Sequence, residues 1–257
     1  MLQNDISSPG DFVRMNKINF EPILEHTILV PVMDQLVELT LTSAWDWGLF
    51  KSGFRGKSLV FPKLKTLKLE SFNIGHYDQF DWILNQTTLT RLQLYFCTIV
   101  THFHFLPNTI HRWSVDTQDW ERFDGRPWFV GHQYARSDFF TFDLRWETIF
   151  NNIRDRLPHL IELSIAWDTY PEVYGQGDDA ATTLDETLTD VQNGYTPFIE
   201  QNHWPFHKFE SGEGFGMRYV GTDDEWIDSD PAEVADIRAL NALFQAVFER
   251  RNKWRYR

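Results

Sequence analysis

Acidic side chains close to tryptophan are the residues of this chain whose types could support catalysis. Asp116, Asp119 and Glu121 surround Trp120, and a second acidic group surrounds Trp226: Asp223, Asp224, Glu225, Asp228 and Asp230. Glycoside hydrolysis uses a pair of carboxylates, so these loops after residue 113 could belong to a hydrolase. Acids in polar stretches are more often solvated loops, and we rank a hydrolase as the lowest alternative for this chain.

Other chemically capable residues form weaker patterns. His102 and His104 alternate along an expected strand, which puts both imidazoles on one side of it, but His111 is not a third metal ligand at convincing spacing. A GxGxG motif at residues 212–216 lacks the preceding strand and following helix that a dinucleotide loop needs. Cys97 falls where a repeat would bury a small side chain. We therefore expect no catalytic, cofactor or metal site, and a protein that is not an enzyme.

The charge of the chain argues against a nucleic-acid partner. Among 257 residues the net charge is −13, whereas contacts with phosphates need a surplus of Lys and Arg. The charge is uneven, because Glu249 to Arg257 hold five basic residues and one acid, or +4, which leaves −17 on the rest. This basic tail could dock on the chain itself or on an acidic partner.

The sequence also indicates the compartment. A single cysteine fits a reducing environment. Met1 to Asp11 do not resemble a secretory signal, and no apolar run approaches the length of a membrane span. We expect a cytoplasmic or nuclear protein that makes no contact with a membrane.

The element that must position any site is a repeated leucine pattern. Residues 64–74 and residues 89–99 both read LxxLxLxx(F/C)xI, 25 residues apart. In this pattern a short strand directs alternate leucines inward and the chain then turns away from the strand. It is the signature of leucine-rich repeats.

Further copies of the pattern are incomplete. The LxxLxL core recurs without its trailing half at Leu36, Leu39 and Leu41, and a later strand has the same spacing at Leu160, Leu163 and Ile165. A weaker strand is predicted at Ile110, Trp113 and Val115. The stretch Gln118 to Phe142 is either a degenerate repeat or an insertion.

Three helices are expected around these strands. Apolar residues at helical spacing predict a short helix over 76–86 and an amphipathic helix from Trp146 to Leu157, which Pro158 ends. A final helix at about 231–252 begins with Asp230 as its cap and Pro231 in its first turn. Repeat arrays need their ends covered, and this helix is suited to do so.

These elements predict an α/β fold, a leucine-rich-repeat-like solenoid. It would have a parallel sheet on one face, short helices on the other, and a C-terminal capping helix. Residues 1–30 are interpreted as an N-terminal edge or linker, and residues 31–257 as the repeat domain.

The amino-acid sequence of the repeats resembles that of a family of fungal F-box proteins with degenerate leucine-rich repeats. The matching text is LVELTLTS (36–43), FPKLKTLKLESFNIGHYDQFDWIL (61–84), LTRLQLYFCTIV (89–100), RWETIFNNIRDRLPHL (145–160) and GMRYVG (216–221). The likeness spans about Leu36 to Arg251, most of the chain.

This resemblance implies a function in ubiquitin-dependent protein turnover. In the family, an F-box docks on the Skp1 adaptor of an SCF-type ubiquitin ligase, while the repeats hold the protein to be ubiquitinated. Met1 to Leu36 lacks the Leu-Pro dipeptide that begins an F-box, so we expect the F-box to be absent and a Skp1-type adaptor to be a partner only through an F-box outside this chain. The runner-up is a ligase-independent leucine-rich-repeat scaffold.

The candidate binding residues are those that point away from the leucines, with aromatic residues where strands end. Both groups could contact a protein, although the first also fits an ordinary solvated sheet face and the second fits packing beneath the turns. The candidates are Glu38, Thr40, Thr66, Lys68, Arg91, Gln93, Tyr95, Glu162 and Ser164 on the sheet, and Trp45, Trp47 and Trp167 at the rim.

Overall fold

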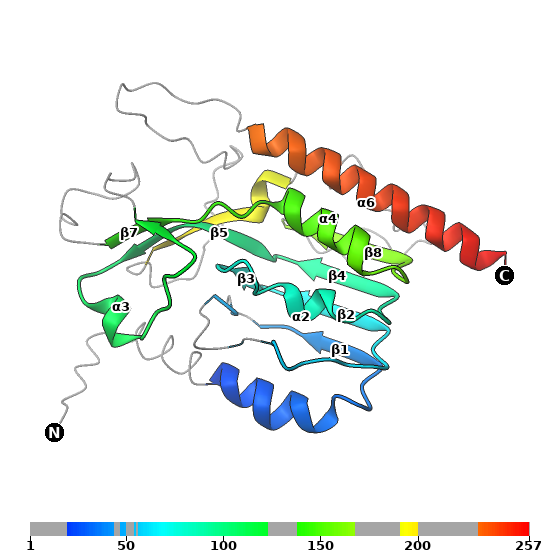
Figure 1. Cartoon of the computed structure of the whole chain (residues 1–257), viewed down its shortest axis with the longest axis horizontal. Coiled ribbons are helices and arrows are strands. Elements are labelled where there is room, and N and C mark those ends of the chain that lie inside the picture. Colours follow the sequence, from blue (N-terminus) through cyan, green and yellow to red (C-terminus); the bar gives the residue numbers. More distant parts are fainter. Residues whose placement is uncertain are drawn as a thin grey trace.

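The computed structural model of the chain describes residues 20–43, 47–49, 54, 56–122, 138–167, 191–199 and 231–256. Within these residues the fold is mixed α/β, with two sheets and with helices on one side of the four-stranded sheet (Figure 1). In chain order the elements are η1 (Leu24–Leu29), η2 (Val30–Val32), β1 (Glu38–Leu41), β2 (Thr66–Glu70), β3 (Asn73–Ile74), α2 (Asp81–Leu84), β4 (Arg91–Tyr95), β5 (Thr98–Phe105), α3 (Thr109–Arg112), β6 (Glu121–Arg122), β7 (Asp138–Thr141), α4 (Trp146–Arg156), β8 (Glu162–Ala166), η5 (Val191–Gly194), β9 (Tyr195–Ile199) and α6 (Pro231–Arg255).

The repeated leucines build the first sheet, whose strand order is β1-β2-β4-β8 with all three pairings parallel. Leu39, Leu67, Leu92 and Leu163 occupy one register row, so the predicted side-by-side stacking of these leucines is confirmed. Leu67 and Leu92 are fully buried. Because side chains alternate along a strand, the residues between the leucines point to the opposite face.

The chain leaves the first sheet at the same position of both full repeats. Ser71 and Phe96, which are 25 residues apart, adopt positive φ angles of 57° and 53°. This turn away from the strand was predicted from the repeat, and it starts β3 and β5, which pair in parallel. Around β5 a second sheet forms, with β7 antiparallel to β5, β6 antiparallel to β7, and β9 parallel to β5.

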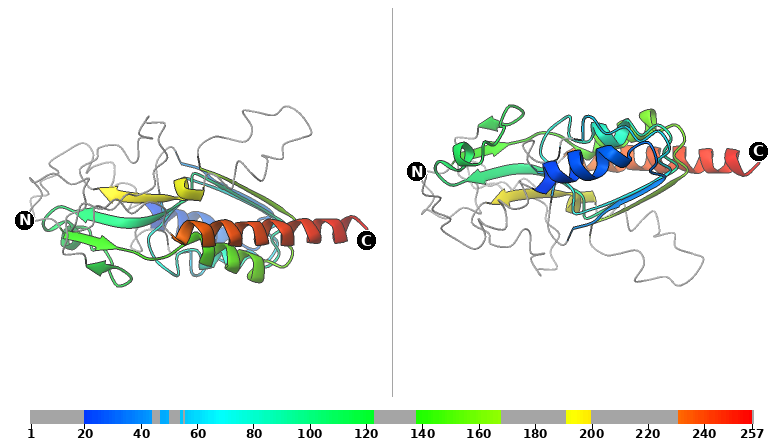
Figure 2. Two further views of the ribbon diagram at one scale, coloured as in Figure 1. Left: turned by 90° about the horizontal axis from the view of Figure 1, so that it is seen from above. Right: turned by 90° about the horizontal axis from the view of Figure 1, so that it is seen from below.

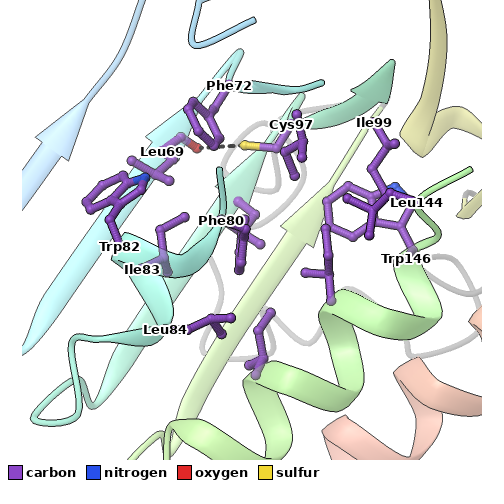
Figure 3. Packing of buried hydrophobic residues seen from close by; sticks show 14 of the residues in the cluster. Leu69, Phe72, Phe80, Trp82, Ile83, Leu84, Cys97, Ile99, Leu144 and Trp146 are labelled. Atoms are coloured by element: carbon purple, nitrogen blue, oxygen red, sulfur yellow. Dashed lines mark hydrogen bonds between the residues drawn. The ribbon is translucent and has the colours of Figure 1, made fainter. Parts of the chain in front are cut away.

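Helices α2, α4 and α6 lie on one side of the first sheet, and no helix or strand among the described residues covers its other side, which we name the open face (Figure 2). The core fills the space between sheet and helices, where side chains of β2, α2 and α4 meet (Figure 3). Trp82 of α2 and Trp146 of α4 are each at most 1% exposed. Cys97 is buried beside them, and its Sγ lies 3.7 Å from the carbonyl oxygen of Leu69, which confirms its structural burial.

The N-terminal helix, residues 20–32, buries its two glutamates, Glu21 and Glu25. Glu21 accepts hydrogen bonds from the amides of Gly48 (2.9 Å) and Phe54 (2.8 Å), and Glu25 accepts one from the amide of Gly56 (2.9 Å). Both carboxylates are more than nine-tenths buried. The helix therefore holds the loop that precedes β2, so residues 20–30 form part of the packed body.

Three segments differ from the elements predicted for them. The strand predicted at Ile110, Trp113 and Val115 is wrong, because residues 109–112 form helix α3. The described ends of 118–142 form β6 and β7, which belong to the second sheet and add no strand to the first. The helix expected over 76–86 exists only as α2 and is preceded by a turn.

The other two predicted helices are confirmed, with slightly different ends. Helix α4 follows the predicted amphipathic stripe and ends at Arg156, next to Leu157 and Pro158. Helix α6 starts at Pro231, as predicted, and continues to Arg255. It packs along α4 and touches β8, and the proposed cap residue Asp230 lies outside the described residues.

Candidate interaction surface

The candidate surface is the open face of the first sheet, the side that carries the residues between the leucines. The register places these residues in two rows across the four strands. The first row is Glu38, Thr66, Arg91 and Glu162, and the second row is Thr40, Lys68, Gln93 and Ser164. The alternation in the sequence therefore identified which side chains share this face, and the strand pairing shows which of them are neighbours.

An ion pair occupies the first row. Arg91 on β4 pairs with Glu162 on β8, and the two side chains stay 46% and 39% exposed. The hydrogen bond that Arg91 donates to Glu162 raises the pKa of the Arg91 guanidinium above its usual value. Exposed pairs of this kind contribute little to stability, about 0–1 kcal/mol, so this pair gives the face a charge pattern more than rigidity.

Lys68 lies at the centre of the face. Its ammonium is 4.8 Å from the ring centroid of Tyr95, a cation–π contact that holds the charge over the aromatic ring. Tyr95 itself is only 2% exposed. Lys68, whose side chain is partly exposed, therefore presents the charge on this face, while the ring of Tyr95 beside it is buried.

The tryptophans at the rim are packed inside. Trp47 is 7% exposed and donates its indole N–H to the carbonyl of Glu70 at 2.7 Å. Trp167 is 5% exposed and donates to the carbonyl of Cys97 at 2.8 Å. Both rings thus fit the alternative of packing beneath the turns and satisfy their polar group there. Trp45, the third rim candidate, lies outside the described residues.

The histidines of β5 are inside the second sheet. Burial lowers the pKa of His102 to about 4, with nearby Arg145 acting in the same direction, and burial also lowers the pKa of His104. Both imidazoles are therefore neutral at pH 7. His111 is exposed on α3. Nowhere in the described ranges do three His, Cys, Asp or Glu side chains gather closely enough to hold a metal ion.

The acids around Trp120 do not face one common site. Trp120 is buried, stacks on Phe103 with centroids 3.7 Å apart, and donates its N–H to the carbonyl of Gly75. Asp119 contacts the buried His76, with 2.9 Å between oxygen and Nδ1. Glu121 belongs to the short strand β6. The second group, around Trp226, lies outside the described residues.

A buried polar network escaped the sequence analysis. Asp236 of α6 is fully buried and accepts hydrogen bonds from the amide of Glu147 (2.6 Å) and from the hydroxyl of Tyr195. The same hydroxyl accepts a bond from the amide of Trp146 at 2.9 Å. The network caps the start of α4 from two other elements, and burial raises the pKa of Asp236 to about 6. The one available signal was an acid at helical spacing from the apolar residues Leu240, Leu243 and Val247 of α6.

Comparison of the chain with models of protein families, with curated proteins and with solved structures found no match. In the part of the chain that the structure describes, no helix has both the length and the apolar character needed to cross a membrane.

Proposed function

We propose that this chain is a protein-recognition module with a leucine-rich-repeat-like solenoid, and that the open face of its first sheet binds the partner. The observation that supports this function is the pair of in-register rows on four parallel strands, with mixed polar and charged side chains at their ends and centre. Extended faces of stacked repeats are suited to bind other polypeptides.

By its resemblance, the module is the substrate-binding region of an F-box protein of an SCF-type ubiquitin ligase, and it is not catalytic. The bound protein would be the substrate for ubiquitination. A Skp1-type adaptor would join through an F-box outside these repeats. The ligase-independent scaffold uses the same face and differs only in lacking the adaptor.

The test compares matched arginine substitutions on the two sides of the sheet. Thr40→Arg with Gln93→Arg places two bulky charges in the second row of the open face. Thr148→Arg with Gln245→Arg places the same charges on exposed positions of α4 and α6, on the helical side. Each full-length variant is tagged and purified from cells, and the bound proteins are quantified by mass spectrometry.

We expect the open-face variant to lose the partners that the wild type and the helical-side variant retain. The same variants are also made in a version of the chain extended upstream in its gene. Skp1 and a cullin bound to all three extended forms would identify the ligase assembly. A partner set that depends on the open face but includes no adaptor even with the extended forms would identify the scaffold. Partners retained by the open-face variant and lost by the helical-side variant would refute the proposal.

A further inference from the structure

The last turns of α6 extend beyond the body of the protein. Leu240, Leu243 and Val247 are buried against the core, and the guanidinium of Arg250 donates to the carbonyls of Leu157 (3.0 Å) and Arg154 (2.5 Å) at the end of α4. After Arg250 the helix continues past the ends of the strands (Figure 2). Among the described residues, Arg250 is the last of α6 to donate a hydrogen bond to the body.

The segment beyond that contact, residues 251–256, combines bare aromatic rings with positive charge; we name it the α6 tip. Trp254 is 68% exposed and Tyr256 is 91% exposed. Arg251, Lys253 and Arg255 are exposed as well, and no carboxylate among the described residues pairs with any of them.

The apolar part of this surface is continuous with the helix before it. Phe248, 59% exposed, lies three residues before Arg251 and seven before Arg255, so these three side chains share one side of the helix. Trp254 follows three residues after Arg251 and lies next to them. Aromatic rings and arginine are the side chains that dominate the energy of protein interfaces.

The charge distribution selects the kind of partner. The last nine residues carry +4, while the rest of the chain carries −17. A nucleic acid or an anionic membrane is too extended to contact the α6 tip without also approaching the rest of the chain. The net negative charge there would repel it, because charges act over about 10 Å at moderate salt. A short acidic polypeptide can contact the α6 tip alone.

We propose that the α6 tip is a docking site for an acidic segment of a partner protein. Arg251, Lys253 and Arg255 pair with its carboxylates, and Trp254 and Tyr256 contact its apolar side chains. This site is separate from the open face of the sheet, so its test does not depend on the proposed function.

The experiment measures the anisotropy of a fluorescein-labelled peptide of alternating Glu and Leu on titration with the full-length protein. The tip variant reverses three charges: Arg251→Glu, Lys253→Glu and Arg255→Glu. The control variant makes the same change in net charge on surfaces away from the tip: Lys57→Glu, Arg112→Glu and Arg122→Glu. We expect the tip variant to bind the peptide about tenfold more weakly than the wild type, which is the combined effect of about three exposed ion pairs. The control variant should bind within about threefold of the wild type, after the smaller loss of long-range attraction.

Removing the ring alone provides a second measurement. Trp254→Ala changes no charge and lies on an exposed end of the helix, so folding is unaffected. We expect a weaker affinity for the peptide and an unchanged slope of affinity against salt, because the lost contact is apolar. An equal affinity of wild type and Trp254→Ala would overturn the apolar half of the proposal.

Three outcomes would overturn the proposed pairing of the basic side chains with carboxylates of the partner. The control variant could lose as much affinity as the tip variant, which would reduce the effect to net charge. A single-stranded oligonucleotide or phosphatidylserine vesicles could bind more tightly than the peptide and depend on the same three bases. Sedimentation could show that the wild type associates with itself through the tip, which would make a second copy the partner.

Discussion

Gln86 offers the sharpest test of how the repeats are held together. Its side chain is 1% exposed, and its carbonyl oxygen accepts the amide of Phe61 at 2.7 Å. Its amide nitrogen donates to the carbonyls of Leu59 (2.8 Å) and Trp82. One side chain after α2 therefore satisfies the backbone of the loop that leads into β2, in a part of the core where Leu59 and Phe61 are buried.

Gln86→Ala should lower the free energy of unfolding by about 3 kcal/mol. The variant leaves the N–H of Phe61 and the C=O of Leu59 buried without their partner, and each such group costs about 1–3 kcal/mol. This loss is a large part of the 5–15 kcal/mol that keeps a typical domain folded. Urea unfolding, followed by circular dichroism and tryptophan fluorescence, measures the change.

Gln86→Glu tests the direction of the bonds. The carboxylate can still accept from Phe61, but it faces the carbonyl oxygen of Leu59, so the variant should be destabilised at pH 7. It should recover part of the loss at low pH, where the protonated acid can donate. The matched control is Gln93→Ala on the open face, for which we expect a change within about 0.5 kcal/mol. A loss below about 1 kcal/mol for Gln86→Ala would show that these bonds do not hold the loop as described.

Further predictions concern the core, the N-terminal helix and the buried acid. Leu92→Ala should cost about 2–5 kcal/mol in urea unfolding, because Leu92 is fully buried in the central leucine row. Glu25→Ala should speed hydrogen exchange at the amide of Gly56, measured by NMR or mass spectrometry, because that amide loses its acceptor. Gly56→Ala should lower the melting temperature, since Gly56 has a φ of +63° and a Cβ there would lie 2.5 Å from the ring of Trp82. In the folded protein the pKa of Asp236 is raised from the ordinary 3.8 to about 6. The ionised carboxylate therefore lowers the free energy of unfolding above pH 6, and protonation restores that free energy as the pH falls. From pH 7 to pH 5 the wild type should therefore gain about 1 kcal/mol relative to Asp236→Asn in paired urea titrations, and equal pH dependence of the two proteins would contradict this.

The sequence predicted the first sheet well because its signal is periodic. A leucine at each repeated position specifies both the strand and the face, and the register of Leu67 with Leu92 follows from the 25-residue spacing. The residue that turns the chain out of the strand, at Ser71 and Phe96, repeats at the same spacing. Local pattern and global packing agree in this region.

The failures occur where spacing alone has two meanings. Ile110, Trp113 and Val115 have the spacing of a repeat strand, but an interval of three residues also fits a helical turn, and residues 109–112 form one. The neighbour of β4 is instead β8, and nothing in the pattern of a single strand identifies its partner along the chain.

The sequence predicted which residues face the candidate surface, but not how deeply each of them is buried. Alternation along the strands placed Lys68 and Tyr95 on the open face, yet Tyr95 is buried beside Lys68 and Trp47 is packed inside. Burial depends on neighbours from other elements, which a strand's own sequence does not specify. For the same reason the contact between Asp236 and the start of α4 could not be found from either segment.

The direct pairing of β4 with β8 also implies an order of assembly. β1, β2 and β4 can pair as the chain folds from its N-terminal part, but Arg91 meets Glu162 only after a span of 71 residues has been brought together. Closing so long a loop costs entropy before the contacts form, and distant pairings of this kind slow folding. Strands β5, β6 and β7 and helix α4 lie within that span, so their collapse shortens the search, and the fourth strand completes the surface last. If synthesis stopped or a protease cut between β4 and β8, a three-stranded sheet would remain. Its edge strand β4 would then be exposed to pairing with other chains.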